Sequence, residues 1–243
     1  AKETGMRKKR LLIWLISLIV IFSILSGCSG NPPDTRQKGL GNGWQVERSV
    51  ELKYAKNFGV DYYNGGYALI SISDGSRYLI VPQGREVPAG IDTGIPVLKQ
   101  PIKNIYLVAT SAMCLFDALD SLDSIGLSGT KAQNWYIENA SAAMETGDIL
   151  YAGKYSAPDY ELIMSSGCNL AIESTMINHT PEVKEKLEDL GIPVLIEQSS
   201  YEPHPLGRTE WIKLYAVLIG KEADAERIFD EQIAYINEVI GQI

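Results

Sequence analysis

The residue types best suited to chemistry gather in one short segment, residues 199–208. Within ten residues it carries hydroxyls, an aromatic ring, a carboxylate, an imidazole and a guanidinium, contributed by Ser199, Ser200, Tyr201, Glu202, His204 and Arg208. Such groups donate and accept hydrogen bonds, so together they can hold a polar or anionic small molecule. The segment therefore predicts a binding loop.

An enzymatic use of this loop is one alternative. Glu202 and His204 could form an acid–base pair acting on a cell-envelope substrate, but they flank a proline and no motif marks a nucleophile beside them. The sequence also has no G-x-S-x-G elbow, no phosphate-binding glycine loop and no H-E-x-x-H motif. A purely structural alternative is a rigid turn, in which Pro203 and Pro205 fix the backbone and Glu202 pairs with Arg208. We expect a binding protein rather than an enzyme.

Direct capture of a divalent metal is a further alternative. Four side chains could meet in the fold and ligate such an ion: His179, His204, Glu202 and Asp159. The two histidines lack the i, i+4 spacing that places two ligands on one helix face. Only the tertiary fold could therefore assemble this set.

Strands and helices alternate along the chain after residue 101. Apolar strands are predicted at residues 104–110, 124–127, 168–173 and 192–197, and helices at 112–119, 135–144, 158–166, 181–190 and 206–219. This alternation predicts right-handed crossovers and a mostly parallel sheet. Ligands of such sheets bind beyond the carboxyl ends of the strands. Four segments qualify for that position: 110–113, 153–156, 174–179 and 199–208.

An antiparallel meander is predicted before this α/β region. Its strands are residues 59–63, 67–73 and 78–82, and glycine-containing turns at 64–66 and 74–76 separate them. A long amphipathic helix is predicted at 221–243. The expected fold class is α/β, namely a three-layer lobe with a mostly parallel sheet, an N-terminal antiparallel meander and a long final helix.

Composition excludes several classes of protein. The chain has 243 residues, of which 45% are hydrophobic and 21% charged, with a net charge of −8. It can therefore bury a core, which argues against disorder, and its acidic balance argues against a nucleic-acid partner. Three cysteines cannot form a disulfide framework. We expect Cys114 and Cys168 to be free, buried thiols.

The first 28 residues have the features of a secretion signal. A basic cluster at residues 7–10 precedes an apolar run at 11–25, and residues 1–5 are interpreted as an extension ahead of Met6. As a helix, that run would reach only about 22 Å, less than a hydrocarbon core of about 30 Å. It ends in Leu-Ser-Gly-Cys, which resembles a bacterial lipobox and predicts lipidation of Cys28. Residues 29–48, rich in Gly, Pro and polar residues, are predicted to be a flexible tether.

The order of these parts resembles the solute-binding lipoproteins of ABC importers for iron–siderophore complexes and cobalamin. The resemblance covers residues 50–243 and is carried by the segments IYLVATSAMCLFDALDSLDSIGLSG, GKYSAPDYELIMSSGCNLAI and IPVLIEQSSYE. That family has two α/β lobes joined by a long helix, with the ligand between them. The resemblance implies that residues 49–219 are the N-terminal lobe, that 220–243 are the interlobe helix, and that the second lobe is missing.

The resemblance also implies particular functional residues. Glu161, in a helix before the strand CNLAI, matches the glutamate with which this family docks on its permease. Arg208 is the best single ligand candidate, because a guanidinium pairs with carboxylate or catecholate oxygens. The ligand-contacting loops of the family correspond here to Ser111, Met113, Lys154, Tyr155, Thr175, Met176, Tyr201, Glu202, His204 and Arg208.

The sequence thus predicts a lipid-anchored, extracytoplasmic binding protein without a cofactor. Its ligand would be a ferric siderophore or a related metal chelate. Its partners would be the permease and ATPase of an ABC importer, and the membrane through the lipid on Cys28. The divalent-metal lipoprotein and the envelope enzyme using Glu202 and His204 remain the alternatives.

Overall fold

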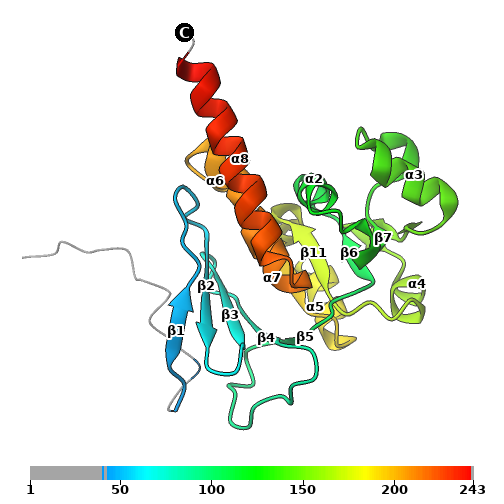
Figure 1. Cartoon of the computed structure of the whole chain (residues 1–243). Helices are drawn as coiled ribbons and strands as arrows, with labels where there is room; N and C mark the ends of the chain where they lie inside the picture. Colours follow the sequence, from blue (N-terminus) through cyan, green and yellow to red (C-terminus); the bar gives the residue numbers. More distant parts are fainter. Residues whose placement is uncertain (1–39, 41–42, 242–243) are drawn as a thin grey trace, which may run out of the picture. The chain divides into compact units, whose positions relative to one another are not determined.

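The structure, a computed structural model, describes residue 40 and residues 43–241 (Figure 1). The predicted signal, the lipidation of Cys28 and the first part of the predicted tether lie outside the described residues. No helix in the described part of the chain combines the length and the apolar character needed to cross a bilayer.

Sheet A contains the predicted meander. Its five strands lie in sequence order: β1 (Val46–Ser49), β2 (Phe58–Tyr63), β3 (Ala68–Ile72), β4 (Arg77–Val81) and β5 (Val97–Lys99). The first four pair antiparallel, whereas β5 pairs parallel with β4. The meander is therefore confirmed, and it is extended by one strand at each edge.

Strand β1 begins inside the segment predicted as tether. Val46 pairs with Tyr63 of β2, and the Trp44 ring packs edge-on against the rings of Tyr63 and Tyr67, with centroid distances of 6.0 and 5.4 Å. Aromatic contacts and strand pairing hold this part of the chain on sheet A. The tether prediction is therefore wrong for residues 43–48.

Sheet B is wholly parallel, with the strand order β12-β11-β6-β7-β8. Its strands are β6 (Ile105–Leu107), β7 (Ile125–Ser128), β8 (Leu150–Tyr151), β11 (Ala171–Ser174) and β12 (Val194–Glu197). The chain adds β7 and β8 on one side of the central strand β6, then crosses to add β11 and β12 on the other. The loops that leave β6 and β11 therefore diverge, which creates a topological switch point between these two strands.

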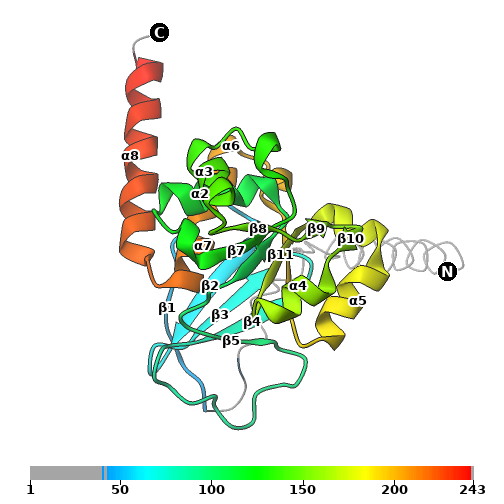
Figure 2. The same ribbon diagram turned by 90° about the vertical axis from the view of Figure 1, so that its right-hand side faces the viewer.

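Helices cover both faces of sheet B. One core joins α2, α3 and α7 to this sheet and to the inner face of sheet A, while a second core joins α4 and α5 to the opposite face of sheet B (Figure 2). This arrangement confirms the three-layer α/β lobe. The helices are α2 (Thr110–Ala118), α3 (Glu138–Thr146), α4 (Tyr160–Ser165), α5 (Pro181–Asp189), α6 (Pro205–Glu210), α7 (Ile212–Ile219) and α8 (Glu222–Gly241).

Several boundaries differ from the prediction. The helix expected at 206–219 is divided at Trp211 into α6 and α7, and α7 is buried along nearly its whole length. Pro158 does not open a helix, because it lies in a small hairpin of β9 (Gly153–Lys154) and β10 (Ala157–Pro158). Asp159 caps α4 instead, accepting a hydrogen bond from the Leu162 N–H at 3.0 Å.

The cysteine prediction is partly wrong. Cys114 and Cys168 are both free thiols, but Cys114 is exposed and Cys168 is half-buried. Cys114 lies on the outer side of α2, whose buried positions are Ala112, Met113, Leu115 and Phe116. The helical period therefore turns Cys114 away from the core.

Candidate functional site

The loops at the carboxyl ends of three adjacent strands contact one another. Ser111 follows β6, and its hydroxyl donates to Glu197 Oε2 at the end of β12, at 2.8 Å. Thr175 follows β11, and its Oγ1 lies 3.2 Å from the hydroxyl of Tyr201, which follows β12. The switch point thus gathers three of the predicted ligand residues, Ser111, Thr175 and Tyr201.

We call Ser111, Thr175, Met176 and Tyr201 the strand-end shelf. Tyr201 is 65% exposed and Met176 is 45% exposed, while Ser111 and Thr175 are half-buried. The shelf therefore presents hydroxyls, a phenol and a thioether to solvent. Groups of these kinds can form hydrogen bonds and apolar or aromatic contacts with a small molecule, and none of them carries charge.

The buried residue Glu197 connects two of the loops that carry shelf residues. Its carboxylate is only 3% exposed; one oxygen accepts the Ser111 hydroxyl and the other accepts the Ser199 N–H at 2.8 Å. It therefore fixes the loop after β6 to the loop after β12. Sequence reasoning missed this residue, although a carboxylate ending an otherwise apolar strand was a usable signal.

Lys154 and Tyr155 lie apart from the shelf. Both belong to the β9–β10 hairpin that follows β8, which is the edge strand on the far side of β6 and β7 from β11 and β12. The hairpin itself is fixed, because the Tyr106 hydroxyl donates to Gly153 O at 2.8 Å. Gly153 has φ +84°, and a Cβ there would lie 2.3 Å from Ala157 O, so only glycine fits.

Two predicted ligand residues are buried in structural roles. Met113 is fully buried in the core of α2, α7 and the two sheets, so it cannot contact a ligand in this state. Glu202 is 3% exposed, and its carboxylate accepts the N–H groups of Lys56 and Asn57 at 2.8 and 2.9 Å. It also accepts the indole N–H of Trp211 at 2.9 Å. The ligand assignments of Met113 and Glu202 are therefore wrong.

Glu202 acts together with Glu210, which is fully buried. The Glu210 carboxylate accepts the backbone N–H groups of Lys53, Tyr54 and Ala55, each at 2.8 Å. We call Glu202 and Glu210 the carboxylate clamp, because they bind five successive N–H groups of residues 53–57. The clamp fastens the segment between β1 and β2 to the loop and helix that follow β12. The alternative in which Glu202 forms an ion pair with Arg208 is therefore wrong, because Glu202 binds backbone N–H groups and the Trp211 indole instead.

His204 is structural as well. Its Nδ1 accepts the Leu206 N–H at 3.1 Å and so caps α6, and its ring stacks on Tyr54 with a centroid distance of 4.6 Å. Since the Glu202 carboxylate is fully engaged, the two residues do not form an acid–base pair. Within the described residues, no three His, Cys, Asp or Glu side chains lie close enough to hold a metal ion. The described structure therefore forms neither the acid–base pair of Glu202 and His204 nor a metal site from the four predicted ligands.

Two further acidic residues, Glu161 and Glu173, differ in their exposure to solvent. Glu161 is exposed on α4, so it is accessible to a protein partner. Glu173, in β11, is fully buried, and neither carboxylate oxygen has a hydrogen-bond partner in the described structure. Burial raises the pKa of Glu173 to about 8, so the carboxyl is largely protonated at neutral pH.

Arg208 lies exposed on α6, beyond the loop that carries Tyr201. Its guanidinium is thus accessible on the same segment as one shelf residue. No hydrogen bond between the described residues connects Arg208 with Tyr201. Arg208 therefore stays a predicted ligand residue and is not counted as a member of the shelf.

Comparison with known proteins gives two relatives. No protein-family model matches the chain. Two uncharacterized lipoproteins of Methanocaldococcus jannaschii are similar to it; one is 24% identical, with alignment over 92% of this chain and 60% of the relative. The other is 26% identical over 98% of this chain and 63% of the relative. The chain therefore spans somewhat over half the length of the curated relatives it matches.

Among solved structures, the periplasmic catecholate-siderophore binding protein VctP of Vibrio cholerae aligns with a TM-score of 0.47. The sequence identity is 12%, and the alignment covers 60% of this chain and 49% of that one.

Proposed function

We propose that this chain is a membrane-anchored solute-binding protein that captures a metal chelate, such as a ferric siderophore, for an ABC importer. The strand-end shelf is the observation that carries the proposal. It lies at the switch point of a parallel sheet, where such folds bind their ligands, and it presents hydrogen-bonding and apolar groups without a catalytic pair. The family resemblance of the sequence supports the same role.

The ligand chemistry follows from the groups nearest the carboxyl edge of sheet B. The phenol of Tyr201 and the hydroxyls of Ser111 and Thr175 suit the oxygen-rich surface of a chelate. Arg208 and Lys154 are exposed cations, and either would attract an anionic complex. An anionic iron chelate therefore fits this surface better than a bare cation.

A second lobe would complete the site. The shelf is open to solvent, and the two relatives are longer than the aligned region. We expect the ligand to be held between the shelf and a second α/β lobe, with α8 as the connection. Lipidation of Cys28 would anchor the protein, and the lipoprotein names of both relatives support this. Exchange of Cys28 for Ser is then expected to move the protein from the membrane fraction to the soluble one.

Permease docking is assigned to Glu161. Its exposure on α4 makes it available, and the motif DYE before β11 supports the assignment. In cells carrying the importer, Glu161→Gln is expected to abolish uptake while chelate binding stays unchanged. The neighbouring exchange Glu182→Gln, at another exposed acidic residue, is the matched control; equal uptake by both variants would refute the assignment.

The binding test uses a ferric tris-catecholate complex and, in mild detergent, the chain together with the second lobe that would complete the site. Trp135 is a suitable reporter, because its indole N–H donates to Ser128 Oγ, at the end of β7, at 3.3 Å. We expect saturable quenching, weakened about fivefold or more by Tyr201→Ala, since a stacked or hydrogen-bonded aromatic contact contributes about 1 kcal/mol or more.

Tyr235→Ala, which removes an exposed tyrosine from α8, is the control and is expected to bind as the native chain does. Absence of saturable quenching up to about 1 mM, or equal weakening by both tyrosine variants, would overturn the proposal.

A further inference from the structure

Glu173 is a buried carboxyl that the proposed binding site does not use. Glu197, Glu202 and Glu210 are buried as well, but each of them accepts two or more hydrogen bonds. Glu173 is completely shielded from solvent, and in the described structure neither of its oxygens has a partner. Because a buried carboxylate without a partner is costly, any charge on Glu173 should recruit a hydrogen-bond donor.

Tyr106 is a donor that sheet B places beside Glu173. In the parallel pair of β6 and β11, Tyr106 lies opposite Ala171, and Glu173 follows two residues later on the same face of the sheet. At a rise of about 3.3 Å per residue and a strand spacing of about 4.8 Å, the two positions are about 8 Å apart. Two long side chains can bridge this distance. Burial, and next the Glu173 carboxyl, raise the pKa of Tyr106, as expected for neighbouring groups.

The Tyr106 hydroxyl is engaged with the β9–β10 hairpin. It donates to Gly153 O at 2.8 Å. The residue opposite Gly153 in the hairpin is Pro158, which has no N–H to donate, so the hydroxyl takes the place of a backbone donor. Since Tyr106 has a single hydroxyl proton, it can donate to Gly153 or to Glu173, but not to both.

No cation neutralises Glu173. The ionisable side chains around Glu173 and Tyr106 are Tyr151 of β8, Tyr160 of α4, Cys168 ahead of β11, His179 behind it and Glu182 of α5. Of these, His179 and Glu182 are exposed, and burial, then Glu182 and then Glu173, raise the pKa of Tyr160. The neighbouring side chains of β12 on this face, Val194 and Ile196, are apolar. Within the described residues, no lysine, arginine or histidine forms an ion pair with Glu173.

We propose that Glu173 and Tyr106 form a pH-dependent hydrogen-bond switch that holds or releases the β9–β10 hairpin. With Glu173 protonated, the Tyr106 hydroxyl donates to Gly153 O, as in the structure. When Glu173 loses its proton to solvent, its carboxylate takes the Tyr106 hydroxyl, because a hydrogen bond to a charged acceptor is stronger than one to a neutral carbonyl. Gly153 O then loses its partner, and the hairpin with Lys154 and Tyr155 is released from β6.

The switch operates close to neutral pH. Burial raises the pKa of Glu173 to about 8, so the carboxyl changes its charge around that value. The inference goes beyond the proposed function, because it concerns the hairpin itself and its test needs no ligand.

The test follows the Gly153 carbonyl by carbon-detected NMR of the full chain in mild detergent. Labelling with carbonyl-¹³C glycine and ¹⁵N lysine gives a carbonyl–nitrogen signal only where a lysine directly follows a glycine. The sequence has two such pairs, Gly153-Lys154 and Gly220-Lys221. The experiment therefore resolves the hairpin carbonyl and one reference carbonyl in the same spectrum.

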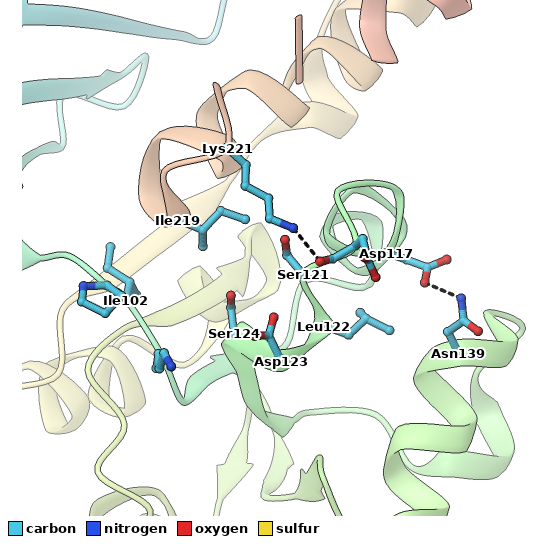
Figure 3. A pocket seen from close by; sticks show the side chains of 12 residues that line it. Ile102, Asp117, Ser121, Leu122, Asp123, Ser124, Asn139, Ile219 and Lys221 are labelled. Atoms are coloured by element: carbon cyan, nitrogen blue, oxygen red, sulfur yellow. Dashed lines mark hydrogen bonds between the residues drawn. The ribbon is translucent and has the colours of Figure 1, made fainter. Parts of the chain in front are cut away.

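The Gly220 signal is the internal control. Gly220 caps the end of α7, and the Lys221 ammonium donates to the backbone oxygens of Leu119 and Asp120, each at 2.7 Å (Figure 3). These contacts lie in the pocket formed by the segments that precede β6 and β7. Lysine and aspartate do not titrate between pH 6.5 and 9.5 at their ordinary pKa values of about 10.4 and 3.9, so this signal should stay constant.

From pH 6.5 to 9.5 we expect the Gly153 carbonyl shift to change, with a midpoint at about pH 8. In Glu173→Gln it should stay at its low-pH value, because glutamine does not titrate. In Tyr106→Phe it should be constant at the value of a carbonyl without the hydroxyl. Tyr160→Phe is the matched control, because it removes the other hydroxyl near Glu173, and it should titrate as the native chain does.

A Gly153 carbonyl shift that stays constant with pH in the native chain would overturn the proposal. So would a titration that persists unchanged in Glu173→Gln or Tyr106→Phe, or one that disappears in Tyr160→Phe. A Gly220 signal at its native position shows that a variant is folded, and the titration of the native chain decides the case if a variant is not.

Discussion

The buried carboxyl of Glu173 makes the stability of this protein depend on pH. Burial raises its pKa from 4.5 to about 8, and neither oxygen has a partner to compensate for a charge. Between these two values the folded chain holds a proton that the unfolded chain releases. Stability should therefore fall as pH rises, by about 1.36 kcal/mol per pH unit from this group alone.

The size of the effect makes it measurable. From pH 5 to pH 7 the contribution of Glu173 amounts to about 2–3 kcal/mol, compared with about 5–15 kcal/mol for the whole stability of a typical domain. Above about pH 8 the decline should level off, because the folded chain then loses the proton as well. Burial or nearby charge raises the pKa values of Tyr106, Tyr160 and Cys168 above their ordinary ranges, so these neighbours do not titrate between pH 5 and 7.

The assay is urea unfolding, followed by tryptophan fluorescence, at pH 5, 6 and 7 for the native chain and Glu173→Gln. The unfolding free energy of the variant should lack this decrease of about 2–3 kcal/mol between pH 5 and pH 7, whatever its absolute stability, because glutamine does not titrate. The control Glu185→Gln, at an exposed position of α5, should keep it. Identical pH dependence of the native chain and Glu173→Gln would refute the reasoning.

Three further predictions concern stability, each measured by urea unfolding at constant pH. Glu210→Ala leaves three backbone N–H groups without an acceptor and should cost about 3–5 kcal/mol; an unchanged midpoint would contradict the clamp. Gly153→Ala brings a Cβ against Ala157 O and should cost more than about 1 kcal/mol, so a neutral result would show that the hairpin opens freely. Met113→Ala should cost about 2–5 kcal/mol and Met176→Ala less than about 0.5 kcal/mol, whereas equal effects would contradict the burial of one and the exposure of the other.

The sequence predicted the elements whose signals are local. Gly65 and Gly75 have positive φ in the turns of the meander, as their turn chemistry indicated. The alternation of apolar strands and helices predicted β6, β7, β11 and β12 of sheet B, because these strands are largely buried on both faces. Strand β8 was not predicted, since both of its residues are exposed. The break at Trp211 was not predictable from the pattern, since the apolar period continues across it.

The site was only partly predictable, because its decisive contacts are distant in the sequence. Glu202 hydrogen-bonds Lys56 and Asn57, which precede it by 146 and 145 residues. No local pattern distinguishes such a carboxylate from one that faces a ligand. Ser111, Thr175 and Tyr201 were found because the carboxyl ends of parallel strands meet at one edge, which is a property of the topology.

In the proposed binding site, the loop after β12 places a candidate ligand residue directly before a structural one. Glu202 has an extended backbone, with φ −63° and ψ 132°, and directly follows the last residue of a short helical turn, Tyr201. Tyr201 projects into solvent beside Thr175, whereas the next side chain is buried in the clamp. Because Glu202 is held by three hydrogen bonds, the backbone carrying Tyr201 is fixed before any ligand arrives. Ligand binding to the shelf would then remove less conformational entropy from this loop. The clamp should therefore contribute to affinity without touching the ligand.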